Sequence, residues 1–207
     1  MSIALLGRFS VTLDGHPVTD FESDRVRALL AYLAVEADRP HTREALAALL
    51  WPEQDAEAAR ANLRHILLKL RRAIGDERAS PPHLLTSRQT LQFNLASDHT
   101  LDVTTLNTLL AACESHPAPD ACAACVDHLS QAVHLYQGSF LAGLSLPTSM
   151  AFEEWARIRQ EQLHRQTLEA LYRLAGFHED NANYAEAQRY AWRQVQLEPG
   201  AKKPTAN

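Results

Sequence analysis

Residues 59–76 read ARANLRHILLKLRRAIGD, and this segment has the period of an amphipathic helix. Its apolar positions fall on one side of such a helix, while its basic and polar positions cover the other side. We expect a helix over about 55–74 that ends at Gly75, a residue type favoured just past helix ends. The apolar stripe comprises Leu63, Ile66 or Leu67, Leu70 and Ile74.

The polar side of this helix is positively charged, although the whole chain has a net charge of −5. No acidic residue lies between Ala58 and Gly75. Guanidinium groups suit phosphate oxygens and guanine edges, and an asparagine can pair with adenine. The alternative is a solvated helix face with i,i+4 ion pairs, but the run contains no acidic partner for them. The residues that we expect to contact nucleic acid on this helix are Arg60, Asn62, Arg64, His65, Lys69, Arg71 and Arg72.

The flanking segments place this helix in a recognisable order. The first 20 residues alternate as strands do, with a hairpin turn at Asp14-Gly15. Two helices follow, one with apolar residues from Val26 to Leu33 and a short one that stops at Trp51-Pro52. After the basic helix, segments 83–86 and 91–95 form a second hairpin. Hairpin, three helices and hairpin is the order of a winged helix-turn-helix, whose third helix enters the major groove.

Arg88 lies at the tip of the second hairpin, which would be the wing. A wing arginine suits a phosphate or the minor groove. A solvated arginine in a turn is the alternative interpretation.

From Asp98 onward the pattern is helical, which predicts a second domain. Expected helices cover 103–113, 121–136, 152–177 and 184–197. The last two fit the spacing of a tetratricopeptide unit. We therefore predict a mainly α chain with an α+β first part: a winged helix over 1–96, and a tetratricopeptide-like all-α domain over 97–207.

The three cysteines lie close together in this second part, in the pattern Cys113-x2-His116 and Cys122-x2-Cys125. Two such pairs match small tetrahedral zinc sites, and four protein ligands would make the zinc structural. Three reduced, half-buried thiols are the alternative. An odd count of three does not fit a secreted disulfide framework.

Other classes of protein are excluded by composition and motif. With 46% hydrophobic residues the chain can build cores, and no apolar run reaches the roughly 18 residues that span a bilayer. The N-terminal segment makes a poor signal peptide, so we expect a cytoplasmic protein with no membrane partner. No Gly-rich phosphate loop, HExxH motif or Gly-x-Ser-x-Gly elbow is present, which predicts that the chain is not an enzyme and requires no cofactor.

Several segments in the same order resemble the antibiotic-regulatory-protein type of bacterial transcriptional activator, in which a response-regulator-type winged helix precedes a bacterial transcriptional activator domain. The similar segments are LLGRFSVTLDGHPV (5–18), RVRALLAYLAV (25–35), LAALLWP (46–52), residues 59–76, AVHLYQGSFLAGL (132–144), FEEWARIRQEQL (152–163) and NYAEAQRYAWRQVQLEP (183–199). The resemblance places the basic helix on the family's recognition helix and Arg88 on its wing. Two departures are Gln89-Thr90 in place of a Gly-aromatic pair, and an end near Pro204 where the family continues with more helices. We therefore expect a second domain truncated at its C-terminus.

The resemblance implies binding to double-stranded promoter DNA, often at direct repeats, and contact with RNA polymerase. The helical part would form a homodimer, take regulatory input or touch the polymerase. A protein-interaction adaptor, with the winged helix as a scaffold only, is the alternative function.

Overall fold

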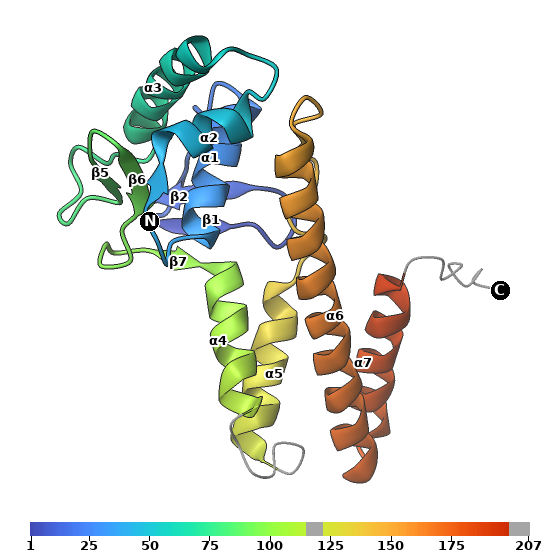
Figure 1. Cartoon of the computed structure of the whole chain (residues 1–207). Helices are drawn as coiled ribbons and strands as arrows, with labels where there is room; N and C mark the ends of the chain where they lie inside the picture. The colour runs from blue at the N-terminus through green and yellow to red at the C-terminus, as the bar shows by residue number, and fades with distance from the viewer. Residues whose placement is uncertain (115–121, 199–207) are drawn as a thin grey trace. The chain divides into compact units, whose positions relative to one another are not determined.

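The computed structural model describes residues 1–114 and 122–198. The chain divides into two compact units, most of whose elements are labelled in Figure 1. The first unit comprises Met1–Thr104 and Gly138–Gln160, and the second comprises Thr105–Gln137 and the residues from Glu161 onward. The domain boundary predicted at 96/97 is a statement about independent folding, which a division into compact units does not test. It therefore stays a prediction. The predicted fold class, a winged helix followed by a helical part, is confirmed.

The first unit opens with a four-stranded sheet in the order β3-β2-β1-β7. β1 pairs antiparallel with β2, so that buried Ile3 lies opposite buried Val11, and β1 pairs parallel with β7. The predicted turn at Asp14-Gly15 joins β2 to β3, and both of its residues have positive φ, 51° and 80°. The strands are β1 (Ser2–Ala4), β2 (Ser10–Leu13), β3 (His16–Pro17) and β7 (Thr100–Leu101).

The winged helix-turn-helix follows this sheet. A second sheet, in the order β4-β6-β5, contains the predicted wing hairpin β5–β6 and the strand β4, which the sequence did not predict. α3 begins at the N-cap Asp55, whose carboxylate accepts hydrogen bonds from the backbone N–H groups of Glu57 and Ala58 at 3.0 and 2.9 Å. Its predicted apolar stripe is buried throughout. The elements are α1 (Asp24–Val35), β4 (His41–Thr42), α2 (Arg43–Leu50), α3 (Ala56–Ala73), β5 (Leu84–Thr86) and β6 (Thr90–Phe93).

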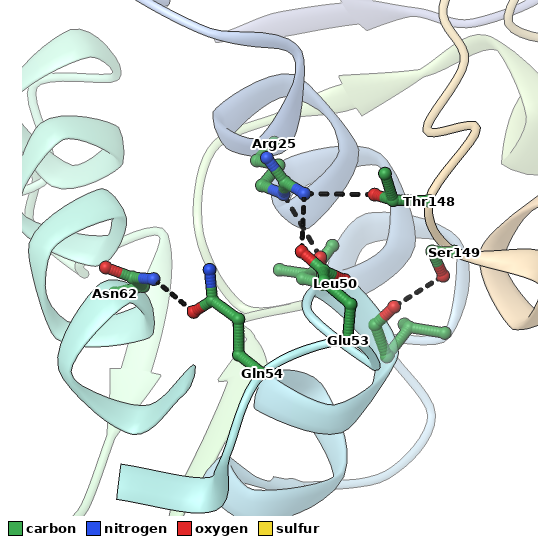
Figure 2. A network of polar contacts seen from close by, with 8 residues as sticks. Arg25, Leu50, Glu53, Gln54, Asn62, Thr148 and Ser149 are labelled. Carbon is green, nitrogen blue, oxygen red and sulfur yellow. Dashed lines mark hydrogen bonds and ion pairs between the residues drawn. The ribbon is translucent and has the colours of Figure 1, made fainter. Parts of the chain in front are cut away.

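A segment distant in sequence completes the first unit. Phe140 forms an antiparallel β-bridge with Leu6, and Phe152 is fully buried. Hydrogen bonds hold the following residues beside the helix-turn-helix: Ser149 Oγ donates to the backbone oxygen of Leu49, and Arg25 donates to Thr148 Oγ1 at 3.0 Å (Figure 2). This segment is therefore part of the winged-helix core.

The second unit consists of helices, two of which begin in the first unit. Its core is formed by leucine and valine side chains from α4, α5 and α6, among them Leu106, Leu129, Val133 and Leu171. The helices are α4 (Asp102–Glu114), α5 (Ala123–Leu135), α6 (Met150–Asp180) and α7 (Tyr184–Leu197), and the four predicted helices are thus confirmed. None of the helices in the described ranges is long and apolar enough to cross a membrane. The tetratricopeptide assignment stays a prediction.

Candidate nucleic-acid interface

The exposed side of α3 carries most of the residues predicted to contact nucleic acid. Arg60, Arg64, His65 and Arg72 are exposed, and Leu68 between them is 52% exposed. The opposite side packs into the first unit through the apolar stripe. The amphipathic period therefore directs the cationic side chains to the solvent, where they are accessible to a polyanion.

Two polar side chains near the start of α3 are already engaged in hydrogen bonds to other residues of the chain. Asn62 Nδ2 donates to Gln54 Oε1 at 2.6 Å, which joins α3 to the turn that follows α2 (Figure 2). Arg60 Nε donates to the backbone oxygen of Ala56 at 2.9 Å. A contact from Asn62 to adenine has to compete with its bond to Gln54.

Lys69 and Arg71 form ion pairs with acidic residues outside the acid-free run. Lys69 Nζ pairs with Glu22, which precedes α1. Arg71 Nε donates to Asp76 Oδ2 at 2.8 Å, and the carboxylate of Asp76 is 1% exposed. Neither acid lies inside the helix, since Glu22 precedes α1 and Asp76 follows α3, so the sequence of the helix alone does not reveal these partners.

The wing is a β-hairpin with Arg88 exposed at its tip, as predicted. Ser87 Oγ accepts hydrogen bonds from the backbone N–H groups of Gln89 and Thr90 at 3.1 and 2.9 Å. These bonds close the turn in place of the Gly-aromatic pair that the resemblance led us to expect.

Arg43 is a basic residue of this surface that the sequence analysis missed. It is the first residue of α2, and its Nε donates to the backbone oxygen of Ser87 in the wing at 3.0 Å. Burial, and then the nearby positive charge of Arg64, lower the pKa of Arg43. The sequence feature that could have identified Arg43 is its position directly after Thr42, the N-cap of α2. Arg43 therefore links the start of α2 to the wing and lies near Arg64 of α3.

In the described ranges, 1–114 and 122–198, five arginines of this surface make no ion pair with a carboxylate: Arg43, Arg60, Arg64, Arg72 and Arg88. We call Arg43, Arg64 and Arg88 the arginine cluster. Cations held near one another without acidic partners are characteristic of a site for phosphate groups.

The predicted zinc ligands are only partly described. Cys113 and Cys125 are buried, and Cys113 Sγ donates to the backbone oxygen of Cys125 at 3.5 Å. Burial, and then hydrogen bonding to the other two thiols, raises the pKa of Cys125 to about 11. His116 lies outside the described residues, and the residues that are described include no cluster of three metal-ligating side chains. The zinc site stays a prediction.

Residues 101–203 match the family pattern of the bacterial transcriptional activator domain. The chain belongs to the bacterial transcriptional activator domain family. This membership confirms the resemblance found in the sequence. Members of the family are transcriptional regulators rather than enzymes.

Relatives of this family member agree with the assignment. It is 32% identical over 87 residues to the transcriptional regulatory protein EmbR of Mycobacterium bovis and of Mycobacterium tuberculosis, which covers 42% of this chain and 22% of EmbR. A solved structure of Mycobacterium tuberculosis EmbR, in complex with a low-affinity phosphopeptide, superposes with a TM-score of 0.66 at 20% identity. That match covers 98% of this chain and 61% of the EmbR chain, and it shows that the fold is shared. The activator-domain chain thus spans less than two thirds of the EmbR length.

Proposed function

We propose that this activator-domain family member is a sequence-specific regulator that binds promoter DNA and activates transcription. In this proposal α3 enters the major groove and the wing follows the adjacent backbone. The observation that carries it is the arginine cluster, in which side chains from α2, α3 and the wing share one surface of an acidic protein.

The electrostatics of this cluster favour a polyanion. Arg43 and Arg64 are near enough for the charge of one to lower the pKa of the other. A phosphate group that approaches both guanidinium groups removes this repulsion and releases counterions from DNA. Arg43 also lies in the first turn of α2, where the helix dipole favours negative charge.

The predicted contact residues then take different roles. Arg64, His65 and Arg72 are exposed on α3 and free to reach base edges or phosphates, and Arg88 reaches the backbone or minor groove from the wing. Lys69 and Arg71 are engaged with Glu22 and Asp76, so they act mainly by positioning α3.

We propose two roles for the helical second unit. It contacts RNA polymerase, and it forms a homodimer. The family membership and the name of EmbR as a transcriptional regulatory protein support this division of roles. A promoter-binding protein works beside bacterial DNA, so we place the chain in the cytoplasm.

The test is fluorescence anisotropy of the full chain with random and promoter-derived duplexes over a salt series. Wild type is compared with Arg64→Ala, and Arg165→Ala on α6 is the matched control because Arg165 is an exposed arginine outside this surface. If Arg64 contacts a base, we expect Arg64→Ala to cost about 1–3 kcal/mol, a weakening of roughly 5- to 150-fold. If Arg64 contacts a phosphate, the variant should reduce the salt slope by about 1. Arg165→Ala should bind as wild type does.

The adaptor function is favoured by one observation, the internal neutralisation of Lys69 and Arg71. An adaptor would not bind any duplex at low salt, so the anisotropy of the labelled duplex would stay the same with wild type and with Arg64→Ala. That result would overturn the proposed function in favour of the adaptor.

A further inference from the structure

A cavity of about 660 Å³ lies in the second unit, between α5 and α7 and beside the first turns of α4. Apolar residues line part of it, including Leu109, Val133 and Trp192. Its charged and titratable lining consists of Arg189, Arg193, His134 and Tyr190, and none of the described residues that line it is Asp or Glu. A cavity lined by two guanidinium groups and no carboxylate favours anions. Arg193 contributes more to this preference than Arg189, because Arg189 also pairs with Glu186 beside the cavity.

Both arginines of this cavity are held in place. Arg193 donates to the backbone oxygen of Tyr136 at 2.8 Å, at the end of α5. The guanidinium of Arg189 lies 4.7 Å from the ring centroid of Tyr190, and it also pairs with Glu186. Tyr190 is itself anchored, because its hydroxyl lies 3.2 Å from that of Ser130 on α5. Such fixed cations lose little side-chain entropy when an anion binds.

The surface continues beyond the cavity along α7. Tyr190 is the one buried residue of this helix, whereas Tyr184, Trp192 and Val195 are 68%, 47% and 43% exposed. Residues 184, 188, 192 and 195 share one face of a helix, since they are spaced by four, four and three. Residues 189, 193 and 196 form the neighbouring face. The first face, which we call the aromatic stripe, carries Tyr184, Gln188, Trp192 and Val195, and the neighbouring face carries Arg189, Arg193 and Gln196.

We propose that this surface, which we call the α7 groove, binds an acidic amphipathic helix of a partner protein. The apolar face of such a helix covers the aromatic stripe, and its flanking carboxylates reach Arg189 and Arg193. An extended ligand fits better than a compact one, because the exposed apolar residues run along α7 past the cavity. The inference does not depend on DNA binding, which involves the other unit.

The probe for a test is a fluorescently labelled synthetic helix with leucine on one face and glutamate on both flanks. Its isomer with lysine in place of every glutamate measures the contribution of charge. Binding to the full chain is followed by anisotropy. We expect the acidic peptide to bind at least about tenfold more tightly than the lysine peptide, as complementary charge favours one partner over its opposite.

Two variants and two matched controls locate the site. Arg189→Glu should weaken binding of the acidic peptide by about tenfold and improve binding of the lysine peptide, because it reverses one fixed charge. Trp192→Ala should weaken both peptides. Arg165→Glu repeats the charge reversal and Tyr172→Ala removes another aromatic side chain, both at exposed positions of α6 outside the groove. Both controls should leave binding unchanged.

Three results would overturn the proposal. The first is equal affinity of the full chain for the two peptides. The second is that Arg189→Glu and Arg165→Glu, with circular dichroism matching wild type, weaken binding of the acidic peptide equally. The third is a dimer in sedimentation that Trp192→Ala converts to monomer. A second copy of the chain would then occupy the α7 groove.

Discussion

At the scale of single residues, the carboxylate of Asp76 joins the end of α3 to the wing. Its Oδ2 accepts a hydrogen bond from Arg71 and its Oδ1 accepts one from the backbone N–H of Leu84 at 2.9 Å, inside the first unit. Asp76→Ala leaves that N–H unpaired and removes the partner of Arg71. We expect the free energy of unfolding to fall by about 2–3 kcal/mol, less than for a wholly buried pair because Arg71 is partly screened by solvent. Urea denaturation measures the free energy of unfolding, and Asp98→Ala, at an exposed position, is the control. An equal loss of stability in both variants would contradict the assigned role of Asp76.

Glu36 gives the first unit a pH dependence. Burial by itself raises the pKa of Glu36, but hydrogen bonds from Trp155 and Arg159, with the charges of Arg159 and Arg39, lower it overall. A carboxyl whose pKa is lower in the folded state stabilises the fold above its unfolded pKa, about 4.3, and loses that contribution as pH falls through its folded pKa.

The prediction is that Glu36→Gln lowers the free energy of unfolding at pH 7 by about 1.5–3 kcal/mol, as expected for hydrogen bonds to a charged group. The difference from wild type should shrink when the pH is taken below about 4. Urea titrations of both proteins over this pH range measure the difference. A difference that grows toward acid pH would contradict the assigned role of Glu36.

The three thiols differ in exposure, which predicts how they react. Cys122 is partly exposed, whereas Cys113 and Cys125 are buried. With Ellman's reagent, we expect one fast thiol in the native protein, lost in Cys122→Ser, and the other two only after unfolding. Zinc held through Cys122 would instead protect this thiol until a chelator is added. The same assay, with metal analysis beside it, therefore tests the predicted zinc site.

At the scale of elements, the start of α2 and the wing form a single unit of the proposed DNA-binding surface. The backbone N–H of Arg43 donates to the backbone oxygen of Gln89 at 2.8 Å, and its side chain bonds to Ser87. Arg43→Ala should weaken DNA binding by about 1 kcal/mol or more and reduce the salt slope by about 1, because a phosphate contact is lost. Arg43→Lys keeps the charge and should restore most of the salt slope. Unchanged binding by Arg43→Ala in the anisotropy assay would remove Arg43 from the surface.

Elements with a strong local signal were predictable from the sequence. The period of α3 located its buried leucines, and Asp14-Gly15 and the two short strands located both hairpins. The pairing of β1 with β7 was not predictable, because strands of three and two residues, far apart in sequence, carry no period of their own. The partners of Lys69 and Arg71 were missed for a related reason: ion pairs across elements depend on tertiary packing, which a search along one helix does not include.

At the scale of the whole molecule, the winged helix shares its core with residues from the middle of the chain. Phe140, Leu141, Leu146 and Phe152 are at most 5% exposed, and all four belong to the first unit. A fragment ending at residue 104 lacks them and exposes the surfaces that they cover. Each such side chain is worth about 1.5–3 kcal/mol when fully buried, so their joint loss is comparable with the entire stability of a domain of this size.

We therefore expect fragment 1–104 to unfold at a lower urea concentration than the first unit of the full chain, when both are followed by the fluorescence of Trp51 in a Trp155→Phe, Trp192→Phe background. Fragment 1–96 should be weaker still, because it also lacks β7, the parallel partner of β1. Phe152→Ala in the full chain is the companion variant, and it should lower the midpoint of the same transition without any truncation, since it leaves a cavity worth about 3–5 kcal/mol. If fragment 1–96 unfolds at the same midpoint as the full chain, the boundary predicted from the sequence is the true folding boundary. The packing of residues 138–160 then contributes nothing to the stability of the winged helix, and their burial stabilises only the helical part.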